Sequence, residues 1–169
     1  PGAAAPIRLE FADIAGGTAG SLLPTGSNRD RVCGVDCTLI DNGMPVVVLR
    51  ADAAGVTGYE SCADLEANPS LLGFLEALHL EAGQLMGLGD VSAATVPKIC
   101  LVAPPRAGGA LSTRTFIPRR CHDAIGVLGA VSVATAALLP GSPSSEVMAP
   151  ISGDSVILEH PTGLFEATI

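Results

Sequence analysis

The stretch RRCHDAIGVLGAVSVATAALLPG, residues 119–141, places two arginines, a cysteine and a histidine before a run of small and aliphatic residues. From residue 122 to 139 the run is almost entirely Ala, Val, Leu, Ile and Gly, and its Ser132 and Thr135 can bond back to the preceding turn. A helix that is apolar on all sides is enclosed by the rest of the protein. The pattern predicts a central buried helix over about 122–139.

Segments with strand-like patterns lie on both sides of this helix in the sequence. They alternate apolar and polar residues, or they are rich in β-branched residues. They cover residues 7–11, 35–40, 45–51, 98–103, 112–117, 155–160 and 163–168. Asn42-Gly43 is a strong turn signal, and it predicts a hairpin between the second and third of these segments.

A second helical region precedes residue 86 and has only one apolar face. Ser61 followed by Asp64 resembles a capping box, and Pro69 suits the first turn of a helix. Beyond Pro69, apolar residues recur at helical spacing, which predicts an outer amphipathic helix. They are Leu71, Leu75, Leu78, Ala82 and Leu85. We therefore expect an α+β domain in which a strongly curved sheet wraps around the apolar helix and the amphipathic helix lies outside.

Composition and charge exclude several classes of partner. The chain has 169 residues, enough for one domain, and its 48% hydrophobic and 15% charged residues favour a folded core. A formal net charge of −8 argues against nucleic acid and anionic membranes as partners. The longest apolar run, of roughly 15 residues, fits a buried helix rather than a membrane span.

Cysteine usage points to a reducing compartment. The five cysteines are an odd number and form no C-x-x-C motif, and no secretory apolar region precedes them. We therefore expect a cytoplasmic protein without a structural metal site. The sequence starts without Met and stops within a strand-like alternation, so it is expected to be part of a longer chain.

The residues before the apolar helix are suited to an anion. A buried helix still has unpaired N–H groups and a positive dipole end at its amino terminus. Pro118, Arg119, Arg120, Cys121 and His122 precede the helix, and Arg and backbone N–H groups together bind carboxylates well. The alternative is that both arginines only reach solvent.

Several longer motifs resemble a known family. They are LLPTG, CTLIDNGMPVVVLRA, GVTGYES, LMGLGDVSAATVPK, LVAPP and TRTFIPRRCHDAIGVLGAVSVATA. They are similar to the second half of the 4-oxalomesaconate tautomerases, which are relatives of the 2-methylaconitate isomerases and have the diaminopimelate-epimerase-like fold. The resemblance implies two similar domains, each a mixed, β-barrel-like sheet around a central hydrophobic helix, with the active site in the cleft between them. Residues 1–169 would be the second domain, with the first domain of the same protein as partner and a homodimer as an open alternative.

The resemblance also implies a reaction. It is a cofactor-independent 1,3-allylic proton shift in 4-oxalomesaconate or a similar unsaturated tricarboxylate. In the family the proton-transferring Lys and Cys lie in the first half, so no catalytic residue is expected in this chain. Diaminopimelate epimerases have a second catalytic Cys at the start of the central helix, and Gly126 takes that position here. Cys121 is then expected to be structural.

The resemblance gives a set of substrate-binding candidates. They are Asn42, Lys98, Arg119, Arg120 and His122, with Ser92 and Thr25 as weaker candidates. Each has a simpler explanation as well: Asn42 can serve the turn, Lys98 can be a solvated strand start and His122 can be a helix cap. His79 is interpreted as a boundary residue of the outer helix, and His160 as part of a turn.

Two other functions stay open. One is 2-methylaconitate isomerisation, since the sequence does not reveal the substrate. The other is a non-catalytic anion-binding or accessory module, because none of the candidate bases in the chain has a partner at a motif spacing.

Overall fold

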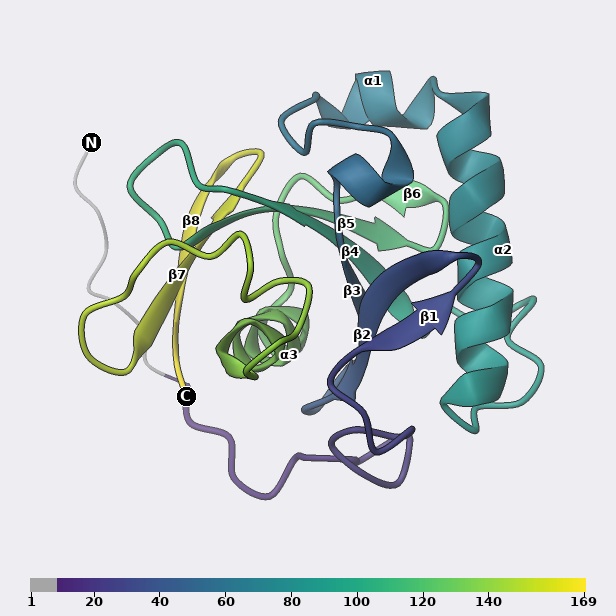
Figure 1. Ribbon diagram of the computed structural model, residues 1–169, viewed down its shortest axis with the longest axis horizontal. Helices are drawn as coiled ribbons and strands as arrows, with labels where there is room; N and C mark the ends of the chain where they lie inside the picture. Colours follow the sequence, from purple (N-terminus) through teal and green to yellow (C-terminus); the bar gives the residue numbers. More distant parts are fainter. Residues whose placement is uncertain (1–8) are drawn as a thin grey trace.

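The computed structural model describes residues 9–169, in which one mixed sheet has helices on both faces (Figure 1). The strands are β1 (Asp30–Val32), β2 (Val35–Asp41), β3 (Pro45–Arg50), β4 (Lys98–Ala103), β5 (Leu111–Ile117), β6 (Arg120–Cys121), β7 (Ser155–His160) and β8 (Gly163–Thr168). The helices are α1 (Cys62–Glu66), α2 (Pro69–Leu85) and α3 (Val127–Leu138), with a short 3-10 helix over Asp52–Ala54. Within residues 9–169, no helix has the length and apolar character needed to cross a membrane.

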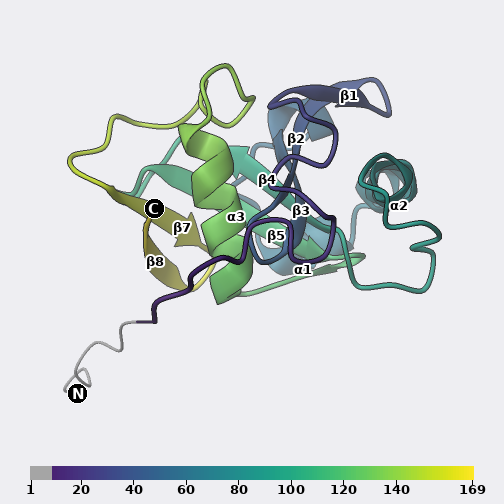
Figure 2. The same ribbon diagram turned by 90° about the horizontal axis from the view of Figure 1, so that it is seen from below.

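The sheet order places the helices. The strands run β1-β2-β3-β4-β5-β7-β8, and the short β6 pairs with β5. The β3–β4 and β5–β7 pairs are parallel and the others antiparallel. Parallel neighbours need a crossover connection. The first crossover contains α1 and α2, the second contains α3, and they cover opposite faces of the sheet (Figure 2).

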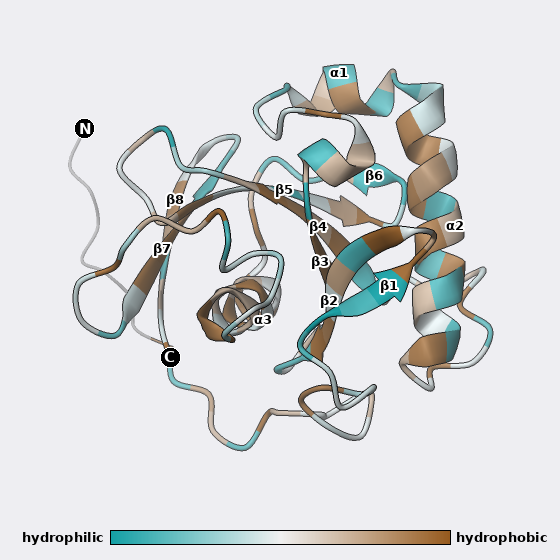
Figure 3. Cartoon of the chain, in the orientation of Figure 1, coloured by the Kyte–Doolittle hydropathy of each residue, from teal (hydrophilic) through white to brown (hydrophobic). Residues whose placement is uncertain are grey.

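The central strands supply both cores. In β3, Val47 and Leu49 pack in the core below α1 and α2, whereas Val46 and Val48 pack in the core around α3. This arrangement explains the continuous apolar sequence of β3, because a strand buried on both faces has no need for alternation. Figure 3 shows the same central strands and α3 as predominantly hydrophobic.

Helix α3 is enclosed on most of its circumference by the curved sheet. It contacts β2, β3, β7 and β8, and Ala130, Ala134 and Ala136 have no exposed surface. The Ser132 hydroxyl donates a hydrogen bond to the carbonyl of Met44 at 2.7 Å. Small residues therefore let the strands approach the helix closely, and its few polar groups are bonded.

The predicted α+β class, the mixed sheet around an apolar helix and the outer amphipathic helix are confirmed. The sheet is open rather than barrel-like, because β1 and β8 form its two edges and do not pair with each other. The strand predicted over 7–11 begins outside the described residues, and residues 9–11 form no strand.

The start of the central helix differs from the prediction. Helix α3 begins at Val127 instead of residue 122. Arg120 and Cys121 pair with β5, and the His122 N–H donates to the Thr115 carbonyl at 2.8 Å. After residue 122 the backbone bends at residues 123–124 and is extended again at Gly126, whose ψ is 147°. Arg119, Arg120 and His122 lie on the β5–β6 hairpin and after it, several residues before the helix.

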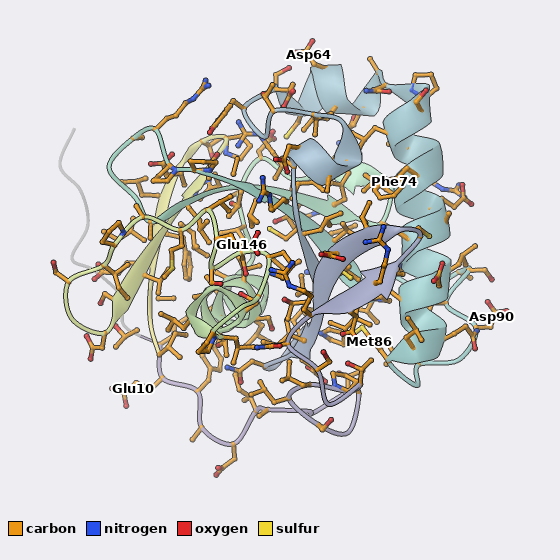
Figure 4. The ribbon with its side chains drawn as sticks, in the orientation of Figure 1. Glu10, Asp64, Phe74, Met86, Asp90 and Glu146 are labelled. Atoms are coloured by element: carbon orange, nitrogen blue, oxygen red, sulfur yellow. The ribbon has the colours of Figure 1, made fainter. Side chains whose placement is uncertain are left out.

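Helices α1 and α2 follow the local signals closely. The Ser61 side chain accepts from the Asp64 N–H, and Asn68 caps α2 immediately before Pro69. Phe74 and Met86 lie on the side of α2 that faces the sheet, whereas Asp90 lies on the outer side (Figure 4). Leu85 departs from the predicted face, since 46% of it is exposed at the last position of the helix.

The connection from α2 to β4 is held against α2 by two residues of the helix. His79 is only 3% exposed, and its ring nitrogens lie 2.9 Å and 3.0 Å from the carbonyl oxygens of Pro97 and Val91. His79 is therefore a buried residue that joins α2 to this connection, and not the boundary residue that we expected. Gly83 lets Val91 pack directly on the helix, because a Cβ there would lie 2.4 Å from a Val91 methyl group.

We predict opposite effects for alanine at the two glycines of α2. Gly83→Ala should lower the free energy of unfolding by about 1–2 kcal/mol, because overpacking against Val91 outweighs the gain in helix propensity. Gly73→Ala should raise it by about 0.5–1 kcal/mol, since nothing lies within 4 Å of the added Cβ. Denaturant titration of both variants measures the difference. Equal effects would show that Val91 does not pack as described.

Candidate functional site

The amino end of α3 is uncapped and accessible. Gly126 is its N-cap residue, makes no side-chain cap, and is exposed to solvent. The Ala130 N–H donates to the Gly126 carbonyl at 2.8 Å in the first turn of the helix. The N–H groups of the residues between them have no acceptor inside the helix. Together with the helix dipole, they form a fixed set of donors for an anion.

Lys98 adds a full positive charge at this end of the helix. Its Nζ lies 3.9 Å from the position that a Cβ on Gly126 would occupy. Lys98 is the first residue of β4 and is half-buried, and it is the only lysine of the chain. We call Lys98, Gly126 and the first turn of α3 the helix-end site.

Strand register places Arg120 near the same end of the sheet. Ile99 pairs with Phe116, and the next residue of β5, Ile117, pairs with Arg120. Lys98 and Arg120 therefore flank the last residue of β5, with backbones about 10 Å apart. Exposed residues 122–124 then lead from β6 towards Gly126. Of the predicted residues, Lys98 is thus at the helix-end site, and Arg120 and His122 lie beside it.

Ser92 and Arg119 line a different space, to which Arg120 also contributes. A cavity of about 520 Å³ lies between α2, the 92–95 segment and the β5–β6 hairpin, and it is lined by Ser92, Arg119 and Arg120. Glu66 and Glu76 also line it, and Glu76 forms an ion pair with Arg119. The two carboxylates would repel the carboxylates of a polyanion, so this cavity is a weaker anion site than the helix end.

Asn42 and Thr25 are hydrogen-bonded within the fold, although Asn42 lines a cavity together with Val127 of the first turn of α3. The Asn42 amide donates to Thr135 Oγ1 at 2.9 Å and its N–H donates to Ser132 Oγ at 3.1 Å. These bonds tie the β2–β3 turn to the middle of α3. Thr25 is an exposed residue whose hydroxyl donates to Asp30 at 2.9 Å. Both side chains already have partners in the fold.

The backbone N–H donors of the first turn of α3 lie about one helical turn later in the chain than the sequence pattern predicts. The sequence pattern predicts a helix that begins at His122, and this start would place the two arginines at its amino end. The available signal was Gly126 itself, a residue tolerated at N-caps that directly precedes the uninterrupted apolar run.

The helix-end site can bind and orient an anion and stabilise negative charge. Cys100, two residues after Lys98, is a poor nucleophile because burial raises its pKa to about 12. Among residues 9–169, no group of three His, Cys, Asp or Glu side chains is placed to hold a metal ion. The groups described at the helix end therefore provide hydrogen-bond donors and positive charge.

Sequence comparison assigns the family. A profile of the PrpF protein family matches residues 1–169. The chain belongs to this family. It is 54% identical to the 4-oxalomesaconate tautomerase of Pseudomonas putida over 171 residues, covering 100% of this chain and 47% of that protein. It is 55% identical to the (4E)-oxalomesaconate Delta-isomerase of Novosphingobium sp. over 165 residues, covering 96% of this chain and 46% of that protein.

Structural comparison finds the same fold in a solved structure. A crystal structure of methylitaconate-delta-isomerase matches with a TM-score of 0.85 and 22% sequence identity. The match covers 92% of this chain and 46% of that chain. The chain thus spans about half the length of the PrpF relatives that it matches.

We predict that Asn42→Ala changes stability and not ligand binding. Loss of the bond to Thr135 should lower the free energy of unfolding by about 0.5–1.5 kcal/mol. Thr25→Val, at an exposed position, should change it by less than about 0.5 kcal/mol. Denaturant titration and calorimetry with trans-aconitate, an unsaturated tricarboxylate, measure the two quantities. Unchanged stability with lost binding would make Asn42 a ligand contact.

Proposed function

We propose that this chain is the substrate-binding half of an isomerase that catalyses a 1,3-allylic proton shift in 4-oxalomesaconate or a similar unsaturated tricarboxylate. The observation that carries the proposal is Lys98, the only lysine of an acidic chain, beside the uncapped amino end of α3. The names of the two relatives that are more than half identical support the substrate.

The reaction needs what this site offers. In an allylic shift a proton leaves one carbon, the double bond moves, and a proton returns two carbons away. Negative charge builds up on the conjugated carboxylate oxygens between the two steps. Fixed N–H donors and an ammonium group stabilise such charge without reorganisation, and they also anchor the carboxylates of the substrate.

Proton transfer is assigned to the rest of the polypeptide. We propose that this chain is the second of two similar diaminopimelate-epimerase-like domains, and that the first domain supplies the catalytic base and acid. The match to about half of each relative supports this division. The substrate would lie between the domains, against the helix-end site, and the reaction would need no cofactor.

Two alternatives make different predictions. A 2-methylaconitate isomerase would use the same donors on a substrate with a methyl group, so assays with both substrates separate them. A non-catalytic anion-binding module would bind tricarboxylates and convert none of them, even when it is joined to the remaining half.

The proposal predicts that Lys98→Met weakens trans-aconitate binding about 10- to 100-fold, because a charge-assisted bond is lost while the aliphatic stem is kept. Arg31→Met is the matched control. It removes the same charge from a side chain that is 71% exposed on β1, and it should change the affinity less than about twofold at physiological salt. Isothermal titration calorimetry measures both variants, and denaturant titration shows that they fold.

The wild-type chain alone should bind trans-aconitate without converting 4-oxalomesaconate. The polypeptide that contains both halves should convert 4-oxalomesaconate. The change in ultraviolet absorbance of the substrate measures this conversion. Equal affinities for Lys98→Met and wild type would remove the helix-end site from the proposal. Turnover by the 169-residue chain at the rate of an intact enzyme would overturn the division between the halves.

A further inference from the structure

Two cysteines that are far apart in the sequence meet below α1. Cys62 is the first residue of α1, and Cys121 is the second residue of β6. They are separated by 59 positions, and their Sγ atoms are 2.8 Å apart. Among residues 9–169, no other two cysteine thiols are within hydrogen-bond distance of each other. The two thiols form a site that the proposed function does not use.

The backbone already holds these thiols together. The side chain of Glu66, at the end of α1, accepts the Cys121 N–H at 2.9 Å, so a hydrogen bond joins the helix to β6 beside the sulfur contact. Ser61 caps the start of α1, and β6 is paired with β5. In Figure 4, Asp64 points away from the sheet, which places the outer face of α1 in solvent. A bond between the sulfur atoms therefore needs little movement of either element.

The two thiols differ in access. Cys62 is half-buried and in contact with solvent, whereas Cys121 is only 5% exposed. An external reagent can thus reach Cys62 first, and Cys121 lies directly behind it. An exposed attacking thiol backed by a buried resolving thiol is the arrangement that thiol–disulfide exchange needs.

A buried cation lies near the pair. Arg114 is 9% exposed, and its guanidinium donates to the carbonyls of Glu60 and Thr113. In residues 9–169 it makes no ion pair with a carboxylate. Burial, the Cys62 thiol and the Glu66 carboxylate raise the pKa of Cys121, and Arg114 opposes them. Cys121 is therefore a thiol at rest, and Arg114 only partly offsets the effect of its burial.

The other cysteines lack a second thiol in contact. Burial raises the pKa of Cys37 and of Cys100 to about 12. Cys33 is partly exposed, but its thiol donates to Glu81 at 3.1 Å, and burial and this carboxylate raise its pKa to about 11. Cys33 is therefore a suitable control for general thiol reactivity.

We propose that Cys62 and Cys121 form a reversible intramolecular disulfide, and that this pair is a modification site for small-molecule disulfides such as oxidised glutathione. The Cys62 thiolate attacks the reagent, forms a mixed disulfide and releases one glutathione. Cys121 loses its proton to solvent, attacks Cys62 Sγ and releases the second glutathione. Two protein thiols and one reagent disulfide are consumed, and one protein disulfide and two glutathione thiols are produced.

The disulfide would fix the segment that leads into the helix-end site. Cys121 lies between Arg120 and His122, and the bond would join this part of the chain to α1. The cross-link also closes a long loop, which stabilises a protein mainly by restricting its unfolded state. The oxidised form should therefore melt at a higher temperature than the reduced form.

The test uses the wild-type chain and three variants, Cys62→Ser, Cys121→Ser and Cys33→Ser. After incubation with oxidised glutathione and removal of the reagent, free thiols are titrated in denaturant. Wild type should fall from five thiols to three. Cys33→Ser should also lose two thiols, and neither Cys62→Ser nor Cys121→Ser should form a protein disulfide. Wild type should rise in Tm by roughly 5–10 °C on oxidation, and a dithiol reductant should reverse the change.

Peptide mapping by mass spectrometry identifies the bond independently of the variants. A linked peptide pair containing residues 62 and 121 is expected in oxidised wild type. The proposal is wrong if wild type stops at a glutathione adduct on Cys62, if Cys62→Ser still loses two thiols, or if the linked pair contains other cysteines. Because Cys62 is half-buried at the surface, its serine variant should fold, and circular dichroism checks that it does.

Discussion

The burial of α3 is the constraint on which the rest of the structure depends. A helix without a polar face has to be covered on most of its circumference, and the sheet achieves this by curving from β2 to β8 around it. The central strands β2 and β3 become buried on both faces, because α1 and α2 cover the other side. This double burial accounts for the apolar run in β3 and for the many small residues in α3.

Burial leaves the two ends of α3 as the places where the helix meets solvent, and the amino end is the one that carries N–H donors. Its unpaired N–H groups and dipole are fixed there by the same packing that buries the helix. In a chain with a net charge of −8, the only lysine stands beside that end. The cavity next to α2 has arginines too, but Glu66 and Glu76 also line it, and Glu76 forms an ion pair with Arg119. The balance of charge, rather than the volume of the cavity, is therefore the reason why we propose the helix end as the anion site.

Local signals in the sequence predicted the elements that depend on local interactions. Ser61 and Asn68 cap their helices, and the Asn42-Gly43 turn joins β2 and β3. The start of α3 was misplaced because a long-range contact decides it: residues 120 and 121 pair with β5, which no local pattern reveals. The contact between Cys62 and Cys121 was unpredictable for the same reason. Lys98 was selected through the family resemblance, and only the register of β4 against its neighbours placed it beside Gly126.

Amide hydrogen exchange along α3 tests the central claim most directly. The N–H groups of residues 127–129 have no helical acceptor, so they should exchange quickly in the free protein. Binding of trans-aconitate should slow their exchange by at least about tenfold if its carboxylates accept these bonds. Residues 93–95, which line the cavity beside α2, should keep their rates. Protection of residues 93–95 with unchanged exchange at the start of α3 would place the ligand in that cavity and contradict the account.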